Sequence, residues 1–445
     1  MSYSPHTEAD RARMLDAVGV GSVDDLFADI PPAVRAGAWD VPPPIVEQDV
    51  RAELARLAGR NRIPEVSFLG AGAYRHLIPS VVGEVIGRPE FATSYTPYQP
   101  EVSQGTLQSI YEFQSLICEL TGMEVATASH YDGATATAEA ALMACRLTRR
   151  SRVAVSAGVS PDYRRVLETY CSGPGIEVVT VAVDLAEGGN GTTDPGAVEA
   201  LDEVACFIAA QPNFYGQIEP MRELADAAHA SGAQFVAVVE PTSLALLEAP
   251  GTYGADIVAA EGQPLGIPVN FGGPYVGLMA ANMASVRQMP GRLVGATRDV
   301  GGRKGYVLTL QAREQHIRRE KAASNICTNQ ALMALAATAY LTAVGPTGLR
   351  EVAELSMAQA RHLTGALESA GLAERRFGGV YLNEVALRVP DAARRHGALA
   401  ERGIVAGHAL ERDEPQLRDT LLLAATELTT DGDIERLVAG LEETR

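Results

Sequence analysis

The chain has 445 residues, 47% of them hydrophobic, and this length predicts two or three domains with a substantial apolar core. Its 37 Lys and Arg residues stand against 55 Asp and Glu residues, which gives a formal net charge of −18. This surplus of negative charge opposes attraction to a phosphate backbone or to an anionic lipid surface. We therefore expect neither nucleic acid nor a membrane as a partner.

The amino terminus, MSYSPHTEAD, lacks the cationic start and apolar run of a signal peptide, so we expect a cytoplasmic protein. The five cysteines lie far apart in the sequence and form no CxxC pair, and no histidine is spaced from them as a metal ligand would be. The sequence thus predicts reduced thiols and no metal site.

Residues 1–65 are expected to form a helical amino-terminal arm. Apolar residues recur at helical spacing in two short segments, 14–18 and 50–57, and the proline-rich sequences DIPPAVRAG and WDVPPPIVE separate them. Both segments are too short to enclose a core, which favours an accessory role for the arm.

Residues 66–310 are expected to form a large α/β domain. Helical spacing predicts a helix from a serine cap at Ser103 to Gly122, and a second helix opens at Gly133. Short apolar runs then alternate with helical segments from about 152 to 260, a pattern typical of parallel strands joined by crossover helices.

Residues 311–345 are expected to form linking helices, and 346–445 a small carboxy-terminal α+β domain. The segment QAREQHIRREKAASN, residues 311–325, is predicted to be helical with a basic face. Such a face is most often simply solvated, and the alternatives are an anion site or contact with an acidic partner.

Three polar residues lie where an α/β fold commonly places a ligand. Thr135 lies in the first turn of the helix that opens at Gly133, where free backbone N–H groups favour phosphate. His130 precedes that turn and could stack on a planar cofactor, and Glu240 follows the buried run QFVAVV at a strand end. Each also has an ordinary structural explanation, namely close helix packing, a packed side chain and a cap.

The segment FATSYTPYQPEVSQG has neither helical nor strand periodicity, and Pro97 and Pro100 fix its path. Polar and aromatic side chains in such a loop favour a site or an interface over simple packing. The candidates are Tyr95, Tyr98, Gln99 and Glu101.

Several segments together resemble one family, glycine decarboxylase, the P-protein of the glycine cleavage system, in its amino-terminal half or separate subunit 1. They include TSYTPYQPEVSQGTLQSIYEFQSLICELTGM, YDGATATAEAALMA, ADIVAAEGQPLGIPVNFGGPYVGLMA and REQHIRREKAASNICTNQAL. The resemblance implies the aspartate aminotransferase-like fold, fold type I, with a large mostly parallel sheet domain and a small α+β domain. It also implies pyridoxal phosphate as the family's cofactor.

The resemblance further implies that the Schiff-base lysine belongs to the partner, subunit 2. Where the fold carries this lysine, after DIVAA, the present chain reads Ala260 to Pro264 with Gln263 and no amine. We therefore expect pyridoxal phosphate on subunit 2, with His130, Thr135, Glu240 and Gln263 as remnants of a cofactor site here. The complete enzyme would decarboxylate glycine and pass the aminomethyl group to the lipoyl group of H-protein.

Two other hypotheses remain open from the sequence. The chain could be a non-catalytic scaffold or regulatory homologue that binds H-protein. It could also be an autonomous pyridoxal phosphate enzyme that uses Lys304 or Lys321, the only two lysines of the chain. Both lysines lie outside the segment in which the fold places the cofactor lysine, which weighs against this last hypothesis.

Overall fold

The computed structural model describes residues 5–37, 40–270 and 272–445. The chain separates into two units, residues 1–62 and 63–445.

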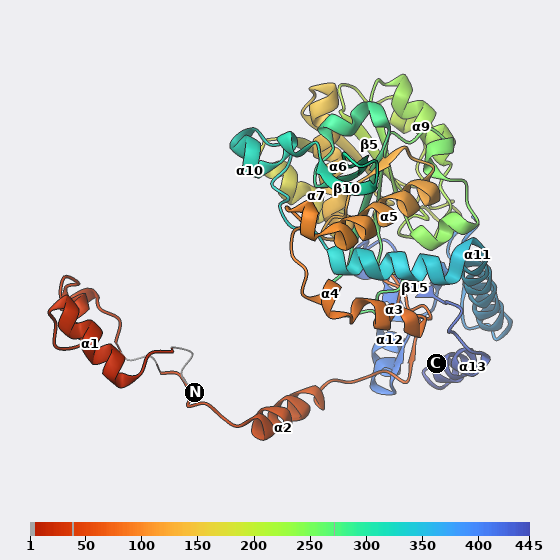
Figure 1. The fold of residues 1–445 in the computed structure, drawn as a ribbon. Helices are drawn as coiled ribbons and strands as arrows, with labels where there is room; N and C mark the ends of the chain where they lie inside the picture. Colours follow the sequence, from red (N-terminus) through yellow and green to blue (C-terminus); the bar gives the residue numbers. More distant parts are fainter. Residues whose placement is uncertain (1–4, 38–39, 271) are drawn as a thin grey trace. The chain divides into compact units, whose positions relative to one another are not determined.

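The first unit consists of short helices joined by proline-rich turns (Figure 1). Its elements are α1 Glu8–Val18, η1 Asp24–Phe27, η2 Pro32–Val34 and α2 Glu47–Ala58. Thr7 caps α1, because its hydroxyl accepts a hydrogen bond from the Asp10 N–H and the Asp10 carboxylate accepts one from the Thr7 N–H. None of the described residues of this unit is buried, so the predicted amphipathic helices form with their apolar faces exposed.

The second unit is built on a seven-stranded sheet in the order β2-β8-β7-β6-β5-β3-β4. The neighbours from β4 through β7 are parallel, and β8 pairs antiparallel with both β7 and β2. The strands are β2 Val125–Ala126, β3 Arg152–Ser156, β4 Glu177–Val181, β5 Cys206–Gln211, β6 Gln234–Val239, β7 Ile257–Glu261 and β8 Gly277–Ala281. The parallel α/β core predicted from the alternating pattern is therefore present.

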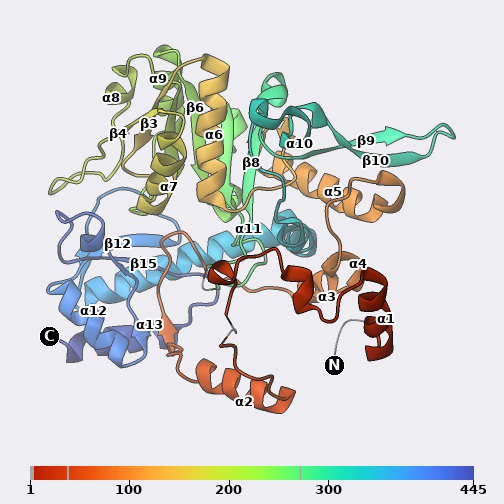
Figure 2. The same cartoon turned by 90° about the vertical axis from the view of Figure 1, so that its left-hand side faces the viewer.

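Both faces of this sheet are covered by helices, and β5 shows how the sequence allows it. Cys206 and Ile208 pack toward α6 and α7, whereas Phe207 and Ala209 pack on the opposite face with α5, α9 and α11, as alternation along a strand requires. Figure 2 shows α6 and α7 side by side on one face. The helices are α3 Ser80–Ile86, α4 Pro89–Ala92, α5 Gln104–Thr121, α6 Gly133–Thr148, α7 Pro161–Ser172, α8 Pro195–Glu199, α9 Met221–Ala230 and α11 Ala331–Ser369, with short turns η3 Pro100–Val102, η4 Pro241–Ala245, η5 Pro250–Thr252 and η6 Met283–Gln288.

The predicted helix before Gly122 forms as α5, and Gly122 ends it with a φ of 68°. The predicted serine cap is wrong in detail, because Ser103 stands at the cap position and its side chain makes no capping hydrogen bond. The Gln104 side chain instead ties the start of α5 to β10, since its amide N–H groups donate to the Pro100 and Tyr306 carbonyls and its oxygen accepts the Tyr306 N–H.

The helix predicted over 311–325 is also wrong. The segment forms three short turns, η7 Gln311–Arg313, α10 Gln315–Arg318 and η8 Arg319–Lys321, and residues 322–330 have no helix. Leu310 and Arg319 have φ angles of 53° and 54°, which interrupt a right-handed helix, and like charges in consecutive turns disfavour one further.

The helix α11 joins the large sheet to the carboxy-terminal region and bends at Gly345–Pro346, where Gly345 has a φ of 60° and a ψ of −177°. Of the predicted linking helices at 311–345, only the part from Ala331 is a regular helix, and after the break at Gly345 a second helical stretch continues to Ser369. By length and composition alone α11 could cross a membrane. A buried core helix has the same composition, and α11 packs against α3, α5 and η4.

The carboxy-terminal region holds an antiparallel sheet in the order β11-β12-β15-β14, covered by helices (Figure 2). We call residues 370–445 the small lobe and the rest of the second unit the large lobe. The elements are β11 Glu374–Arg375, β12 Glu384–Arg388, α12 Ala392–Glu401, β13 Ile404–Val405, β14 His408–Ala409, η9 Leu410–Arg412, β15 Thr420–Ala424 and α13 Asp431–Glu443. The strand β1 Val66–Ser67 pairs with β13, so the start of the second unit is tied to the small lobe.

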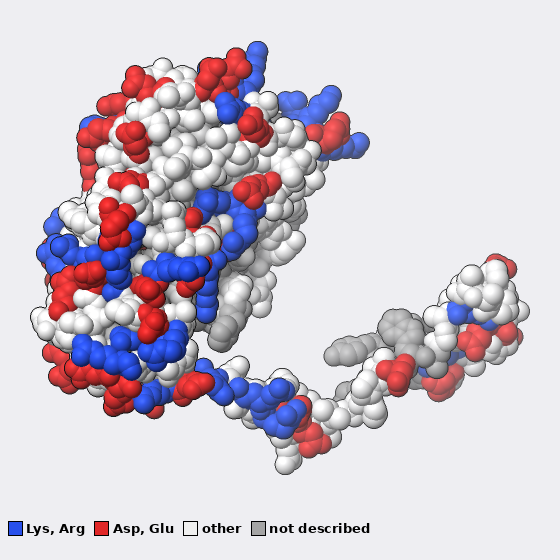
Figure 3. Space-filling model, turned by 180° about the vertical axis from the view of Figure 1, so that it is seen from behind, with Lys and Arg blue, Asp and Glu red and all other residues white. Residues whose placement is uncertain are grey.

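A two-stranded ribbon, β9 Leu293–Arg298 and β10 Lys304–Thr309, extends from the large lobe (Figure 2). Leu107 and Ile110 of α5 pack with Val294 and Leu308 at its base. On the face drawn in Figure 3, basic and acidic side chains alternate over the second unit, so its described residues form no continuous basic surface there.

Candidate functional site

A cavity of about 80 Å³ lies at the carboxyl ends of β5, β6 and β7, which we call the strand-end cavity. Parallel α/β sheets commonly bind ligands at this edge. The strands contribute Ala210, Val238, Val239, Glu240 and Glu261, the segment before α3 contributes Ala71, Gly72 and Tyr74, the start of α7 contributes Ser160 and Tyr163, and β12 contributes Glu384, with Pro212, Asn213, Phe214, Pro241 and Pro264 completing the lining.

Three glutamates face this cavity. Glu240 caps η4, and its carboxylate accepts the N–H groups of Thr242 and Ser243. Burial raises the pKa of Glu261 and of Glu384 to about 7, although each carboxylate accepts backbone hydrogen bonds that act in the opposite direction. Two carboxyls of the cavity therefore titrate near neutral pH.

Glu261 joins the end of β7 to the start of α6. One carboxylate oxygen accepts the Gly133 N–H at 2.9 Å, and the other accepts the N–H groups of Gln263 at 2.9 Å and Val276 at 3.2 Å. The first free amide of α6 is therefore bound to a carboxylate of the chain itself.

The segment 70–77 crosses between the two lobes and is bonded to both. Gln263 accepts the Tyr74 N–H and donates to the Tyr74 and Ile267 carbonyls. Glu384 of the small lobe accepts the Ala71 N–H at 2.6 Å and the Tyr74 hydroxyl at 2.8 Å. Side chains from both lobes thus hold the chain that forms one wall of the strand-end cavity.

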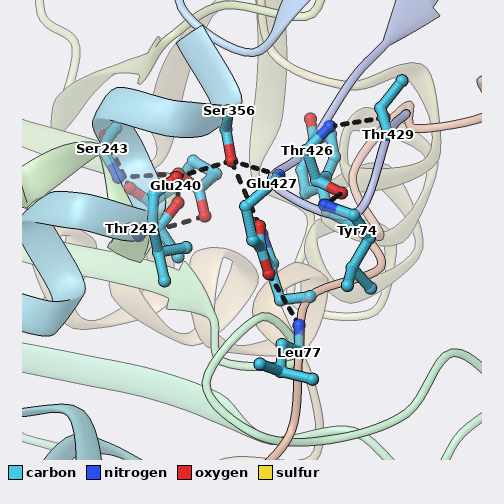
Figure 4. A network of polar contacts seen from close by, with 12 residues as sticks. Tyr74, Leu77, Glu240, Thr242, Ser243, Ser356, Thr426, Glu427 and Thr429 are labelled. Carbon is cyan, nitrogen blue, oxygen red and sulfur yellow. Dashed lines mark hydrogen bonds and ion pairs between the residues drawn. The ribbon is translucent and has the colours of Figure 1, made fainter. Parts of the chain in front are cut away.

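The far end of this segment is bonded in the same manner (Figure 4). Glu427 of the small lobe accepts the Leu77 N–H at 2.6 Å, lies 2.7 Å from the His76 ring and is 3.3 Å from the Ser356 hydroxyl of α11. Within the turn after β15, the Thr426 N–H donates to the Thr429 hydroxyl. The polar contacts in Figure 4 therefore connect the segment 70–77, α11 and the small lobe.

Of the four predicted cofactor-site remnants, two lie at the strand-end cavity. Glu240 lines it, and Gln263 supports its wall through Tyr74. Thr135 lies in the first turn of α6, where its hydroxyl bonds Asp132 in a reciprocal cap. His130 lines no part of the cavity, because its ring is fully buried and close to Gly291, and burial lowers its pKa to about 4.

The predicted loop residues lie elsewhere, at the base of the β9–β10 ribbon. The Tyr98 hydroxyl accepts a hydrogen bond from Arg292 at 3.1 Å, and the guanidinium lies 5.3 Å from the centre of the Tyr98 ring. Arg292 itself is buried and lies 3.6 Å from Glu314. Tyr95 is 78% exposed and Tyr98 45% exposed.

Gln99 and Glu101 are exposed on the same loop. None of these loop residues lines the strand-end cavity. The loop therefore presents its polar and aromatic groups to a different surface from the one on which the strand ends converge.

Most residues of the cavity were not indicated by the sequence, among them the acidic and phenolic side chains Tyr74, Tyr163, Glu261 and Glu384. Glu261 could have been found, because it ends a buried strand in the same manner as Glu240. Tyr74 and Glu384 lie 310 residues apart in the sequence, and no local pattern connects them.

The residues of the strand-end cavity do not fit pyridoxal phosphate. After β7 the chain has Gln263, and its amide is bonded to the backbone of Tyr74 and Ile267. The first amide of α6, a place suited to a phosphate, is already bound to Glu261. A phosphate would also meet the negative charge of up to three glutamates, so both chemistry and geometry oppose the cofactor.

Comparison with known proteins gives a match over nearly the whole chain. The family model described as glycine cleavage system P-protein matches residues 1–441. A protein of Moorella thermoacetica, named probable glycine dehydrogenase (decarboxylating) subunit 1, is 52% identical over 99% of this chain and 99% of its own length. A similarly named protein of Desulfitobacterium hafniense is 49% identical over the full length of both chains.

A solved structure agrees with this match. The crystal structure of glycine decarboxylase (P-protein) of the glycine cleavage system, in inhibitor-bound form, covers 100% of both chains with a TM-score of 0.91 and 46% identity. The expected aspartate aminotransferase-like fold is confirmed, with its large mixed sheet and small antiparallel sheet. The chain belongs to the glycine cleavage system P-protein family, and its relatives of matching length are the separate subunit 1 proteins.

Proposed function

We propose that this chain is subunit 1 of a two-subunit glycine decarboxylase and acts together with a separate subunit 2 in the cytoplasm. The observation that carries the proposal is the match of the whole chain, at about half identity, to proteins named as subunit 1 of glycine dehydrogenase (decarboxylating). The complete enzyme would release carbon dioxide from glycine and transfer the aminomethyl group to the lipoyl group of H-protein.

The proposal assigns pyridoxal phosphate to subunit 2. The two lysines of this chain support that assignment by their positions, since Lys304 begins β10 and Lys321 ends η8, and neither lines the strand-end cavity. Subunit 1 would contribute shape and hydrogen-bonding groups to a cavity whose cofactor is held by its partner.

The loop with Tyr95 and Tyr98 is the best candidate for that contribution. The buried Arg292 holds the Tyr98 ring through a hydrogen bond and a cation–π contact, yet the ring remains partly exposed. A phenol held in place and open to one side can donate a hydrogen bond to a group on another chain. We infer that Tyr98, with Tyr95 beside it, faces the glycine-binding cavity of subunit 2, and that Gln99 and Glu101 lie at the same subunit interface.

Reconstitution tests the assignment. The chain, purified subunit 2 and lipoylated H-protein are mixed, and the exchange of labelled carbon dioxide into the glycine carboxylate is measured. We expect exchange only in the complete mixture. Exchange by the chain alone would refute the proposal, and a stable complex whose activity does not depend on this chain would favour the scaffold hypothesis.

The cofactor assignment has a separate test. The full chain is incubated with pyridoxal phosphate and reduced with borohydride, and its peptides are mapped by mass. We expect no stoichiometric label. A full label on Lys304 or Lys321 would instead support the autonomous enzyme.

Single substitutions test the loop. Tyr98→Phe and Tyr95→Phe keep the ring and remove only the hydroxyl, and losing one such donor costs about 1–3 kcal/mol, roughly tenfold to a hundredfold in turnover of the complex. Tyr170→Phe on α7 is the matched control, because Tyr170 lies outside both the loop and the strand-end cavity. Thermal stability and association with subunit 2 should not change. Equal turnover in all three variants would remove these hydroxyls from the mechanism.

A further inference from the structure

We propose that the Glu261 carboxylate is a built-in anion at the start of α6, where free backbone N–H groups favour phosphate, so that the chain excludes phosphate-bearing cofactors there even apart from its missing lysine. The inference deepens the proposed function, because it names the residue that keeps the cofactor out of this subunit. It rests on the contacts of Glu261, on the space around Gly133 and on the charges of the strand-end cavity.

The contacts of Glu261 are those of an anion site. Three backbone N–H groups from separate segments converge on one carboxylate: Gly133 at the start of α6, Gln263 after β7 and Val276 before β8. Converging backbone amides at a helix start are the usual way in which proteins bind phosphate. Here the same donors are satisfied from within the chain, so a phosphate would have to displace Glu261.

The space around Gly133 is also filled. A methyl group added at Gly133 would lie 2.1 Å from the Tyr163 hydroxyl and 2.7 Å from the Glu261 backbone nitrogen. The ring of Tyr163 and the end of β7 therefore press directly against the start of α6. A phosphate that accepts the Gly133 N–H must therefore take the place of the Glu261 carboxylate, because that carboxylate lies where the N–H points.

The charges of the cavity act in the same direction. Glu240 and Glu384 line the same cavity as Glu261, so an incoming dianion would approach two further carboxyls. Glu240 differs from Glu261 in its hydrogen-bond partners, which makes it a suitable control. Among the described residues its carboxylate binds groups of the short turn η4, namely the N–H groups of Thr242 and Ser243 and the Thr242 hydroxyl, and its removal would leave the α6 amide bound to Glu261.

A purely structural role for Glu261 makes different predictions. If the carboxylate only ties β7 to α6, its replacement weakens the fold and creates no new affinity. If it holds the place of a phosphate, removing it should uncover an anion site. The measurement must therefore look for a gain of binding.

The test compares Glu261→Ala with the wild-type full chain and with Glu240→Ala, using inorganic phosphate as the probe. Bound radiolabelled phosphate is measured by equilibrium dialysis near pH 8, and circular dichroism and binding to subunit 2 verify the fold. We expect Glu261→Ala to bind phosphate at least tenfold more tightly than the wild type, and Glu240→Ala to change less than threefold. Equal phosphate affinity in a folded Glu261→Ala and the wild type would overturn the proposal.

Two further variants keep the proposal open to refutation if Glu261→Ala does not fold. Glu261→Gln keeps the size of the side chain and removes its charge, and its phosphate affinity should rise at least threefold; an unchanged affinity would count against the proposal. Gln263→Lys alone and Gln263→Lys with Glu261→Gln are then treated with pyridoxal phosphate and borohydride. We expect at least tenfold more label on residue 263 in the double variant, and equal labelling would again contradict the role of Glu261. Neither measurement depends on activity with subunit 2, so a failure here is distinguishable from a failure of the proposed function, which the carbon dioxide exchange of the wild-type chain tests.

Discussion

Replacing Glu384 with glutamine should change how the stability of the chain depends on pH. Burial raises the pKa of Glu384 to about 7, against 4.5 for an unperturbed glutamate. As the pH rises, the carboxyl therefore ionises first in the unfolded chain, and between these two values the folded state binds more protons. The stability contributed by this proton is complete below pH 4.5 and is lost as the pH rises through 7.

The magnitude follows from the two pKa values. Their difference, 7 minus 4.5, corresponds to about 3 kcal/mol of stability lost above neutral pH, of which only about 1 kcal/mol is already lost at pH 5. Glutamine carries no such proton, and it keeps one acceptor for the Ala71 N–H or the Tyr74 hydroxyl, at a cost of about 1 kcal/mol for the other bond. Relative to the wild type, Glu384→Gln should gain roughly 2–3 kcal/mol between pH 5 and pH 8.5.

Urea unfolding of the full chain at about pH 5, 7 and 8.5 measures this gain. Glu401→Gln on α12 is the control, because Glu401 is exposed and has no carboxyl-specific hydrogen bond among the described residues. We expect the difference in unfolding free energy between Glu384→Gln and the wild type to rise with pH, and the control to stay flat. A difference that is the same at all three pH values would refute the reasoning, because the buried carboxyl would then not change its protonation on unfolding.

Two further predictions concern the core. Gly133→Ala should lower the unfolding free energy by about 3 kcal/mol or more, because the added methyl would lie 2.1 Å from the Tyr163 hydroxyl. In the control Gly365→Ala in α11, the added methyl meets nothing within 4 Å, and the unfolding free energy should rise by up to about 1 kcal/mol. Similar effects of the two substitutions in thermal or urea unfolding would contradict this prediction. The Tyr340 hydroxyl is buried and has no hydrogen-bond partner among the described residues. Tyr340→Phe should therefore leave the unfolding free energy unchanged or raise it by about 1 kcal/mol. If urea unfolding shows that the unfolding free energy falls by more than about 1 kcal/mol, the hydroxyl has a hydrogen-bond partner after all.

The large sheet could be predicted because its signal is local. The apolar runs that became β3, β5, β6 and β7 are buried on both faces, and β3, β5 and β6 are each followed or preceded by a helix of suitable length. Gly122 and Gly133 mark helix boundaries for reasons of backbone conformation and close packing, which a sequence also records. These features depend on residues near one another in the chain.

The errors arose where local signals compete. The run 311–325 has helix-forming residues, yet its like charges and the backbone at Arg319 divide it into short turns. The start of α6 suggested a phosphate site, but Asp132 and Glu261 already bind its first amides. Glu261 lies 128 residues from Gly133, so the sequence near the start of α6 does not show that a glutamate binds its first amide.

The contacts of the strand-end cavity suggest why this half of the enzyme keeps the cavity at all. The chain's own side chains connect the two lobes here: Gln263 and Glu384 bind the segment 70–77 from opposite lobes, and Glu427 binds its far end. Each bond joins elements that are distant in sequence, so together they resist movement of one lobe relative to the other. Under the proposed function, such rigidity would help the chain to present the Tyr95–Tyr98 loop to subunit 2 in one position. Glu427→Gln weakens this connection far from the Tyr95–Tyr98 loop. We expect it to increase hydrogen exchange at residues 70–77 and to reduce turnover of the complex less than Tyr98→Phe does. Unchanged hydrogen exchange at these residues would mean that Glu427 does not hold the segment.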